Sequence, residues 1–320
     1  MKCIIRRMAT AMLCILLLAT TVFGKELIPG GQVVGLELRD RKVVVAGFDE
    51  QQGKTAQAAG VKNGDVIQKI DDTMIFSAED VRKALKQSDG TVTLQINRDG
   101  NVHSFQLVPN ITQDGPRLGL YLRQGITGIG TVTWYDPEQK TFGTLGHGVN
   151  DGSGGLLQMT QGNIYGARVV SVKKGKSGEP GQLIGALKSP EIVGKLYKNT
   201  QQGVFGASNE QWEGKAIPVA KNEEIKTGDA VIRSTVAGEL PREYSVKILK
   251  IYPKSRNNGR NLLLRVTDPA LLEATGGIVQ GMSGSPIIQN GKLIGAVTHV
   301  LVNDPTTGYG IFIENMLNAA

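Results

Sequence analysis

The sequence predicts a mainly β protein that is organised in more than one domain. Among its 320 residues there are 42 glycines and few aromatic side chains, and short Val- and Ile-rich runs recur between turn-forming residues. This pattern is typical of short strands joined by tight turns. A chain of this length suffices for roughly two domains, each with its own core. We therefore expect a β-rich architecture with a barrel or sandwich in the larger part.

Residues 1–24 have the pattern of a signal sequence or a signal anchor. Lys2, Arg6 and Arg7 precede an uncharged stretch from Met8 to Gly24. A basic flank followed by an apolar run directs export. The apolar part is short for a spanning helix of about 20 residues, so cleavage and retention in the membrane both stay open. In either case we expect the body of the chain to be exported.

The cysteines and the charge exclude several classes of function. Cys3 and Cys14, the two cysteines, lie in the N-terminal segment, so the exported body contains none. Disulfides, zinc–thiolate sites and a cysteine nucleophile are therefore excluded for the body. The formal net charge is +7, but no basic stripe with interleaved aromatic residues accompanies it. We expect no nucleic-acid partner, and no cofactor or metal.

A small α+β domain is predicted for residues 33–108, after an exposed linker at 25–32 that contains Pro29-Gly30-Gly31. Two strand-like runs are followed by a short helix with a glycine turn, an amphipathic helix capped by Ser77, and two further strands. This order resembles a PDZ domain of the bacterial protease-associated type. The segments that carry the resemblance are Ala58-Ala59-Gly60-Val61-Lys62-Asn63-Gly64-Asp65-Val66-Ile67 and Asn97-Arg98-Asp99-Gly100.

The PDZ resemblance implies a peptide-binding edge. In such domains a chain end or an extended segment adds as a strand beside an edge strand, and a glycine-containing loop holds its carboxylate. By position this edge is Leu36 to Leu38, with Val34-Gly35 as the loop. Val34, Gly35 and Leu36 are thus predicted to contact a peptide. The alternative is that Gly35 only forms a turn and that the domain serves as a spacer.

Residues 120–320 are predicted to form a second, β-rich domain, after a polar, glycine-containing linker at 109–119. Helical signal is limited to Asp268–Ala274 and the tail from Glu314. Many short strands at this spacing favour a barrel or sandwich over βαβ units. The expected strands are Gly128–Tyr135, Thr141–Leu145, Ile164–Val172, Leu183–Ala186, Ala230–Val236, Tyr244–Tyr252 and Leu262–Val266.

A serine in a turn of small residues is the most informative feature of this domain. Ser283 lies in Gly281-Met282-Ser283-Gly284-Ser285-Pro286, and two β-type runs joined by Asn290-Gly291 follow it. Glycines on both sides of a serine let backbone N–H groups approach a developing oxyanion. Ser283 is therefore the candidate nucleophile, and Ser285 is its competitor. An ordinary turn before a hairpin is the alternative.

The general base must come from the three histidines. His147 is flanked by glycines in Gly146-His147-Gly148, directly after a predicted strand, which suits an accessible, proton-shuttling imidazole. The alternative for His147 is a turn histidine that is hydrogen-bonded to the backbone. His103, in the last strand of the PDZ-like domain, is expected to be structural. His299 alternates with apolar residues, so we expect a supporting or buried role, although it could face the site.

A carboxylate is expected to orient the histidine and hold its tautomer. Asp268 is the candidate, because it comes at the end of a predicted strand and fifteen residues before Ser283. Its rivals are Asp151 beside the histidine, Asp229 and Asp304. Asp151 and Asp229 have the context of ordinary turn residues. Asp268 could itself be the N-cap of the helix that follows it, and this alternative stays open.

The PDZ-like module and these motifs together resemble the stage IV sporulation protein B peptidases of endospore-forming bacteria. The motifs are Leu145-Gly146-His147-Gly148, Val266-Thr267-Asp268, Gly276 to Pro286, Gly295 to Val300 and the tail Asn303 to Gly310. The resemblance implies a self-processing serine endopeptidase with a chymotrypsin-like double β-barrel and a triad of His147, Asp268 and Ser283. It also implies export from the forespore to the space between its two membranes. There the family cleaves a membrane-embedded regulatory complex, which releases the late mother-cell sigma factor.

Met282 departs from the wider chymotrypsin pattern. Digestive members carry an aspartate at this place, where it pairs with a newly cut N-terminus and shapes the oxyanion hole. We expect the N–H groups of Gly281 and Ser283 to form the oxyanion hole, organised in another way, such as by release of the PDZ domain after self-cleavage. The competing hypothesis is a non-catalytic PDZ scaffold whose protease-like domain binds a membrane partner.

Overall fold

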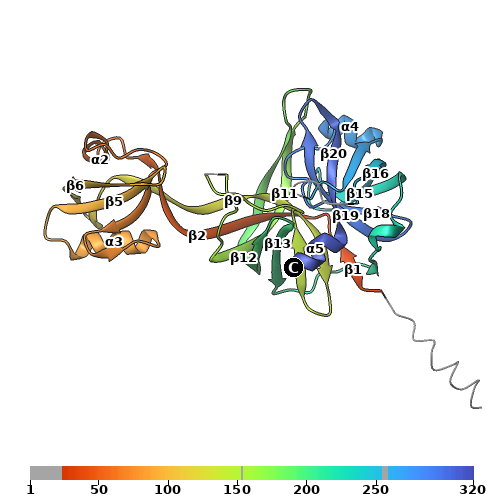
Figure 1. Cartoon of the computed structure of the whole chain (residues 1–320), viewed down its shortest axis with the longest axis horizontal. Coiled ribbons are helices and arrows are strands. Elements are labelled where there is room, and N and C mark those ends of the chain that lie inside the picture. The colour runs from red at the N-terminus through yellow and green to blue at the C-terminus, as the bar shows by residue number, and fades with distance from the viewer. Residues whose placement is uncertain (1–23, 153, 254–258) are drawn as a thin grey trace, which may run out of the picture.

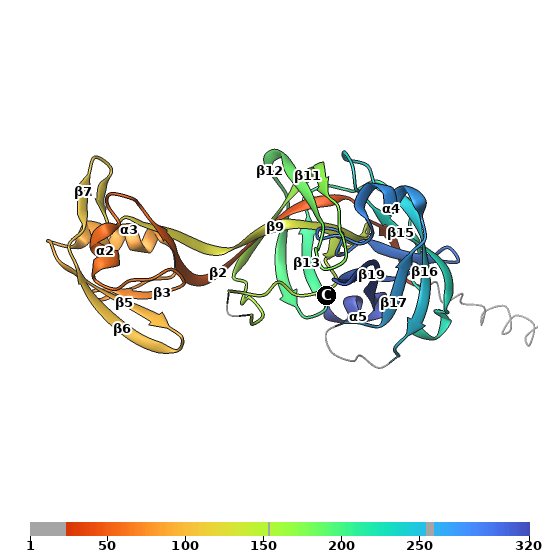
Figure 2. The same cartoon turned by 90° about the horizontal axis from the view of Figure 1, so that it is seen from above.

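The computed structural model describes residues 24–152, 154–253 and 259–320. It contains a PDZ unit that stands away from a larger body of two β-barrels, and two long strands join the parts (Figures 1 and 2). The predicted mainly β fold with a PDZ domain is confirmed. The predicted signal segment lies outside the described residues, apart from Gly24. In the part that is described, no helix is long and apolar enough to cross a membrane.

The first barrel closes through the pairing of two long strands, β2 and β9. Its strands pair in a ring, in the order β2 (Val33–Phe48), β11 (Gln161–Lys173), β12 (Gln182–Thr200), β13 (Gly203–Ser208), β10 (Thr141–Thr144) and β9 (Leu120–Asp136), which pairs again with β2. All these pairings are antiparallel. Alternate side chains point inward, and Leu36, Val132, Phe142 and Ile164 form part of the resulting core.

The second barrel is a separate closed ring. It consists of β15 (Gly228–Ser234), β16 (Arg242–Ile251), β17 (Leu262–Val266), β20 (Asp304–Phe312), β19 (Lys292–Leu301) and β18 (Pro286–Gln289). Helix α4 (Pro269–Thr275) follows β17, and α5 (Ile313–Ala319) follows β20. The β18–β19 hairpin turns at Asn290 and Gly291, whose φ angles of 52° and 74° are those a type I′ turn requires. The predicted Asn-Gly hairpin is therefore confirmed.

The PDZ unit has its own core and a buried ion pair. It contains the second half of β2, α2 (Lys54–Ala58), β3 (Val66–Ile70), β4 (Thr73–Met74), α3 (Ala78–Gln87), β5 (Val92–Arg98) and β6 (Asn101–Leu107). Ser77 caps α3 by accepting the Asp80 N–H at 3.1 Å, as predicted. The Asp65 carboxylate accepts two N–H groups of Arg98, each at 2.7 Å. Burial acts to raise the pKa of Asp65, but these bonds outweigh it and lower the pKa.

Both predicted linkers are ordered structure. Strand β1 (Glu26–Pro29) pairs with β9 and with β14 (Ile217–Pro218), and Leu27 is fully buried. Residues 109–119 contain a small hairpin of β7 (Asn110–Thr112) and β8 (Gly115–Arg117), and β8 packs against α3. A short 3₁₀ helix, η1 (Asn222–Glu224), precedes β15. The two segments are therefore not exposed links.

Strands β2 and β9 belong to both parts of the molecule. Residues 34–38 of β2 pair with β11 on one side and β9 on the other, whereas residues 43–44 pair with β9 and β3 in the PDZ unit. The PDZ boundary predicted at residue 33 therefore falls inside the first barrel. The polar residues 39–42 interrupt the apolar pattern where the strand leaves one sheet for the other, and the β2–β9 register shifts between Leu38 and Val43. Removal of residues 25–110 would take β1 and β2 out of the barrel, so the PDZ unit is not released by such a cut.

Candidate active site

Ser283 lies in a turn that strand β9 holds from the first barrel. The Thr131 N–H donates to the Ser283 carbonyl at 3.1 Å, and the buried Thr131 hydroxyl donates to the Gly281 carbonyl at 2.7 Å. Thr133, two residues further along β9, donates its hydroxyl to the Gly284 carbonyl at 2.8 Å. Gly284 has a φ of 97°, and a side chain there would collide with the Thr131 carbonyl. Glycine is therefore required after the serine so that the two barrels can approach.

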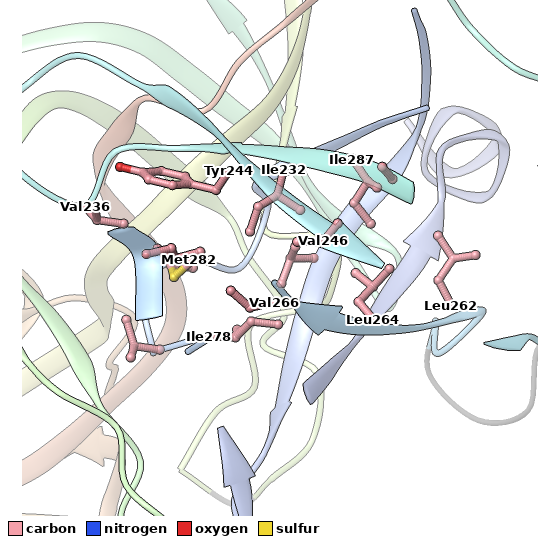
Figure 3. Close-up of a cluster of buried hydrophobic side chains, with 14 of the residues drawn as sticks. Ile232, Val236, Tyr244, Val246, Leu262, Leu264, Val266, Ile278, Met282 and Ile287 are labelled. Atoms are coloured by element: carbon pink, nitrogen blue, oxygen red, sulfur yellow. The ribbon is translucent and has the colours of Figure 1, made fainter. Parts of the chain in front are cut away.

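Met282 anchors the same turn from the second barrel. Its side chain is fully buried and points into the cluster that contains Ile232, Val246 and Ile278 (Figure 3). An aspartate here would bring a charge into an apolar core, which is strongly unfavourable without a partner. Burial of an apolar side chain stabilises the turn instead. The structure therefore holds the residue before the serine by packing, with no ion pair to form at this position.

Two backbone N–H groups are available to an oxyanion. The Gln280 carbonyl accepts the Leu183 N–H at 2.8 Å, and the Gln280 N–H donates to the Gly181 carbonyl at 3.0 Å. Because C=O and N–H of one planar peptide point in opposite directions, the bond to Leu183 turns the Gly281 N–H away from β12. Among the described residues, the N–H groups of Gly281 and Ser283 have no hydrogen-bond partner, and both residues line one cavity. These are the two groups that the sequence predicted for the oxyanion hole.

His147 is presented by a loop whose backbone fixes its tautomer. Its Nδ1 lies 3.0 Å from the carbonyl oxygen of Gly148, which can only accept a hydrogen bond. The ring proton therefore lies on Nδ1, and Nε2 keeps its lone pair. A side chain at Gly148 would collide with Leu156 and with the Thr200 carbonyl. The glycine after the histidine thus allows close packing of the loop, in addition to the access for which it was predicted.

Asn199 clamps the histidine loop to the end of β12. Its side-chain oxygen accepts the Val149 N–H at 2.9 Å, and its amide nitrogen donates to the carbonyls of Val149 at 2.8 Å and Leu157 at 2.9 Å. One side chain therefore satisfies three backbone groups next to the base. The sequence analysis missed this residue and Thr131. Thr131 and Thr133 could have been found as polar positions that alternate with Val132 and Trp134 along β9.

Ser283 and His147 line the same cavity, which has a volume of about 350 Å³. In this structure the Ser283 hydroxyl donates to the Thr298 carbonyl at 2.9 Å. His299, the next residue along β19, places its ring 5.4 Å from that of His147, measured between centroids. The predicted nucleophile and base are thus brought together by the fold, one from each barrel.

The environment keeps both neighbouring histidines neutral near pH 7. Burial lowers the pKa of His147 below 6.5, and its bond to the Gly148 carbonyl offsets part of this effect. Burial, the adjacent His147 and Arg260 lower the pKa of His299 to about 4. A neutral His147 is the form that can accept a proton. A neutral His299 adds no positive charge against the imidazolium that forms during proton transfer.

The structure does not place Asp268 beside His147. The Asp268 carboxylate accepts the N–H groups of Leu271 at 3.0 Å and Ser245 at 3.3 Å, and it caps α4. Among the described contacts of Asp268, none reaches the histidine, and Asp268 does not line the cavity. The N-cap alternative from the sequence is thus the role seen here. A strand end followed by Asp-Pro is compatible with both roles, so the pattern could not separate them.

The rival carboxylates also have structural partners. Asp151 forms an ion pair with Lys42 at 2.7 Å, where the histidine side of the barrel meets β2. Asp304 accepts hydrogen bonds from the hydroxyls of Thr306 and Thr307 at 2.6 and 2.7 Å. Asp229 is exposed on β15. In the described part of the chain, no group of three or more His, Cys, Asp or Glu residues could hold a metal ion.

Burial and strand pairing bear on three further predictions. Ser285 is fully buried and donates to the Ser234 hydroxyl at 3.0 Å, so it is not exposed to a substrate. Val34, Gly35 and Leu36 were predicted as a peptide-binding edge of the PDZ domain, and this prediction is wrong. They lie in the first barrel, where strands β11 and β9 occupy both sides of β2. His103 is exposed on β6 of the PDZ unit, as a structural histidine was expected to be.

Two β-barrels that bring a serine, a neutral histidine and free backbone N–H groups to one cavity define the class of serine peptidases. The family described as SpoIVB peptidase S55 matches residues 114–317, and the PDZ domain family matches residues 32–108. The first match covers more than half of the chain. The chain therefore belongs to the SpoIVB peptidase S55 family and is a serine peptidase with a PDZ domain.

Individual proteins resemble the chain only in part. A curated protein named putative zinc metalloprotease Atu1380, from Agrobacterium fabrum, is 34% identical over 82 residues, which are 25% of this chain and 22% of that protein. The inactive form of the Rv3671c protease gives a TM-score of 0.36 at 15% identity, over 60% of this chain and 82% of that one. The active form from M. tuberculosis gives 0.36 at 19% identity, over 61% and 73%. Such TM-scores carry no argument about this chain.

Proposed function

We propose that the chain is an exported, self-processing serine endopeptidase in which Ser283 is the nucleophile and His147 the general base. One observation carries this assignment. The two side chains line one cavity together with Gly281, and the N–H groups of Gly281 and Ser283 have no partner among the described residues. Nucleophile, base and oxyanion donors are the minimum set for acyl transfer.

The geometry supports a two-step hydrolysis. Ser283 Oγ attacks the carbonyl carbon of the scissile bond while its proton passes to Nε2 of His147. The displaced electron pair makes an oxyanion, which accepts hydrogen bonds from the N–H groups of Gly281 and Ser283. When this intermediate collapses, the C–N bond breaks and His147 gives the proton to the leaving amine. Water then attacks the acyl-enzyme by the same route, which releases the acid and restores Ser283.

A backbone carbonyl takes the orienting role in this proposal. The Gly148 carbonyl holds the Nδ1 proton of His147, and Asn199 holds the loop that carries this carbonyl. A carbonyl fixes the tautomer, but it stabilises an imidazolium less than a carboxylate does, because it carries no full charge. We therefore propose a Ser-His pair with a backbone acceptor as the working unit, and Asp268 as a helix cap.

The biological role that we propose follows the family. The S55 match and the family resemblance support a role in endospore formation. The N-terminal segment, in which an apolar run follows basic residues, supports export. In this role the peptidase is exported from the forespore and remains anchored or is released after processing. It cleaves itself and a membrane-embedded regulatory complex, which leads to activation of the late mother-cell sigma factor. The PDZ unit would recognise the protein partner.

The nucleophile and the base are tested by substitution. We expect Ser283→Ala and His147→Ala each to lower kcat/KM for peptide hydrolysis about 10³-fold or more, without loss of the fold. Circular dichroism and thermal melting would check the fold. His103→Ala, on the exposed face of the PDZ unit, is the matched control and should keep full activity. Retained cleavage in Ser283→Ala would refute the assignment, since buried Ser285 offers no replacement.

A reactive probe separates the enzyme from a scaffold. A fluorophosphonate should label the wild-type protein at Ser283, and labelling should disappear in Ser283→Ala. A scaffold with a protease-like domain would show no labelling in either protein. That result would favour the non-catalytic hypothesis over the one proposed here.

A further inference from the structure

The cavity beside Ser283 has a wall that the chemical steps do not use. Leu36 and Leu38 of β2, Ile126 of β9, and Leu145 and Val149 of the histidine loop contribute apolar residues to it. A cavity of about 350 Å³ lies within the range of roughly 300–1,000 Å³ found for ligand pockets. The reacting groups lie in the same cavity. A substrate held at Ser283 must therefore place part of its chain against this apolar wall.

We infer that this cavity binds an apolar substrate side chain next to the scissile bond, and that Gly128 limits its size. The inference rests on the proposed function, because it concerns the substrate of the same site. Of the described residues that line the cavity, none carries a formal charge while His147 is neutral. Burial of an apolar side chain is favourable here, whereas a charged one would lose its hydration without gaining a partner.

Gly128 lies where the cavity meets a second hollow. It pairs with Leu36 in the β2–β9 ladder, and together with Ile129, Gln280 and Gly281 it lines both hollows. The second hollow has a volume of about 390 Å³ and is bounded on its far side by residues 182–185 of β12. Gly128 therefore lies at the border of the two hollows, next to the turn that carries the Gly281 N–H. A side chain added at this position would enter the space beside that turn.

The space at Gly128 is open, so the position can be tested without damage to the fold. A Cβ atom added there would meet no other atom within 4 Å, and the backbone is not in the left-handed region. A larger side chain would instead extend from the strand into the hollows. Thr127, its exposed neighbour in β9, points to the opposite face, because side chains alternate along a strand. Thr127→Phe is therefore a matched control that adds the same ring on the other side.

The test uses internally quenched peptides in which each residue flanking the cleaved bond is varied among Gly, Ala, Leu, Phe, Asp and Lys. We expect the wild-type protein to prefer Leu or Phe over Asp or Lys at one flanking position, by about tenfold or more in kcat/KM. Gly128→Ala, Gly128→Val and Gly128→Phe should shift this preference stepwise toward Ala and Gly. Thr127→Phe should keep the wild-type preference.

Labelling by a small fluorophosphonate separates this inference from the proposed function. If the wild-type protein is neither labelled nor active, the proposed function fails. If the protein is labelled and active, but an acidic or basic side chain is preferred, the apolar pocket is refuted. If Gly128→Phe keeps both the labelling and the wild-type preference, Gly128 does not set the size limit. The same conclusion follows if Gly128→Phe lowers kcat/KM by one common factor for all peptides. A preference that shifts with unchanged labelling is the expected result.

Discussion

The loops that carry Ser283 and His147, the proposed nucleophile and base, are held by different kinds of side-chain contact. The histidine loop is bound by the amide of Asn199, which makes three hydrogen bonds to backbone groups. The serine turn is held by packing of fully buried Met282 in one barrel and by the hydroxyls of Thr131 and Thr133 from the other. One amide thus makes three bonds to the histidine loop, whereas the serine turn shares its side-chain contacts between two barrels.

This difference predicts unequal tolerance to substitution. Loss of the Asn199 side chain removes all three of its hydrogen bonds to the histidine loop. Loss of one threonine hydroxyl leaves Met282 in its core and the backbone bonds of the turn intact. Positional errors of about 1 Å at a reacting group can cost about 10²-fold in rate, so the less redundant loop should be the more sensitive one.

Substitution of Asn199 is expected to have the largest effect of the three changes. Asn199→Ala should lower kcat about 10²-fold with little change in KM, because the Gly148 carbonyl no longer holds His147. Asn199→Asp keeps the acceptor for the Val149 N–H but loses both donated bonds, so it should fail in a similar way. Steady-state kinetics would show the split between kcat and KM.

A control for the Asn199 variants is Asn209→Ala, which removes one amide bond to the Ile192 carbonyl at an exposed site. The control should keep the wild-type kcat. Asn199→Ala leaves backbone N–H and C=O groups without a hydrogen-bond partner. This should also lower the free energy of unfolding by about 1–3 kcal/mol, measured by urea denaturation. Full activity in both Asn199 variants would show that the loop does not need this clamp.

Substitution of Thr131 should have an intermediate effect. Thr131→Val is nearly isosteric, but it removes the bond to the Gly281 carbonyl and so loosens the peptide beside the oxyanion hole. Complete loss of one oxyanion donor costs about 10²–10³-fold in kcat, so a displaced donor should cost about tenfold. Thr131→Ser should restore the activity, because it keeps the hydroxyl.

Thr235→Val is the matched control for Thr131→Val, since Thr235 is also fully buried and donates to a backbone carbonyl, that of Gly31, at 2.9 Å. The two valine variants should lose similar stability in thermal melts. Only Thr131→Val should lose kcat. Equal activity of the two variants would mean that the hydroxyl supports the fold and not the oxyanion hole.

Substitution of Asp268 should have the smallest effect. Asn caps helices about as well as Asp, so Asp268→Asn should change kcat/KM less than about twofold. Because burial lowers the pKa of His147, the neutral base should persist below pH 6.5, and activity should fall only as pH drops through that lowered pKa. This acid limb should be the same in the variant. If Asp268 oriented the histidine, its replacement by an amide would instead lower kcat about 10⁴-fold, and the pH–rate profile would show this loss.

Local sequence patterns identify the parts of the candidate site that depend on backbone shape. Ser283 and His147 could be proposed from the sequence because glycines lie beside them, and the structure shows that Gly284 and Gly148 are required for a close approach of the chain. The Asn-Gly hairpin after the serine was found for the same reason. The residue that binds the histidine loop was not predicted, because Asn199 is 52 positions from His147 and has no local motif.

The sequence by itself determined the fold class, the PDZ module and the family, and it indicated the two side chains that we propose as nucleophile and base. The tertiary structure decided that Val34–Leu36 belong to the barrel, that Asp268 caps α4, and that an amide and threonine hydroxyls hold the site. The physical reason is that turns, caps and strand alternation are local, so neighbouring residues encode them. Contacts between barrels join distant residues, and their geometry exists only once both sheets have closed.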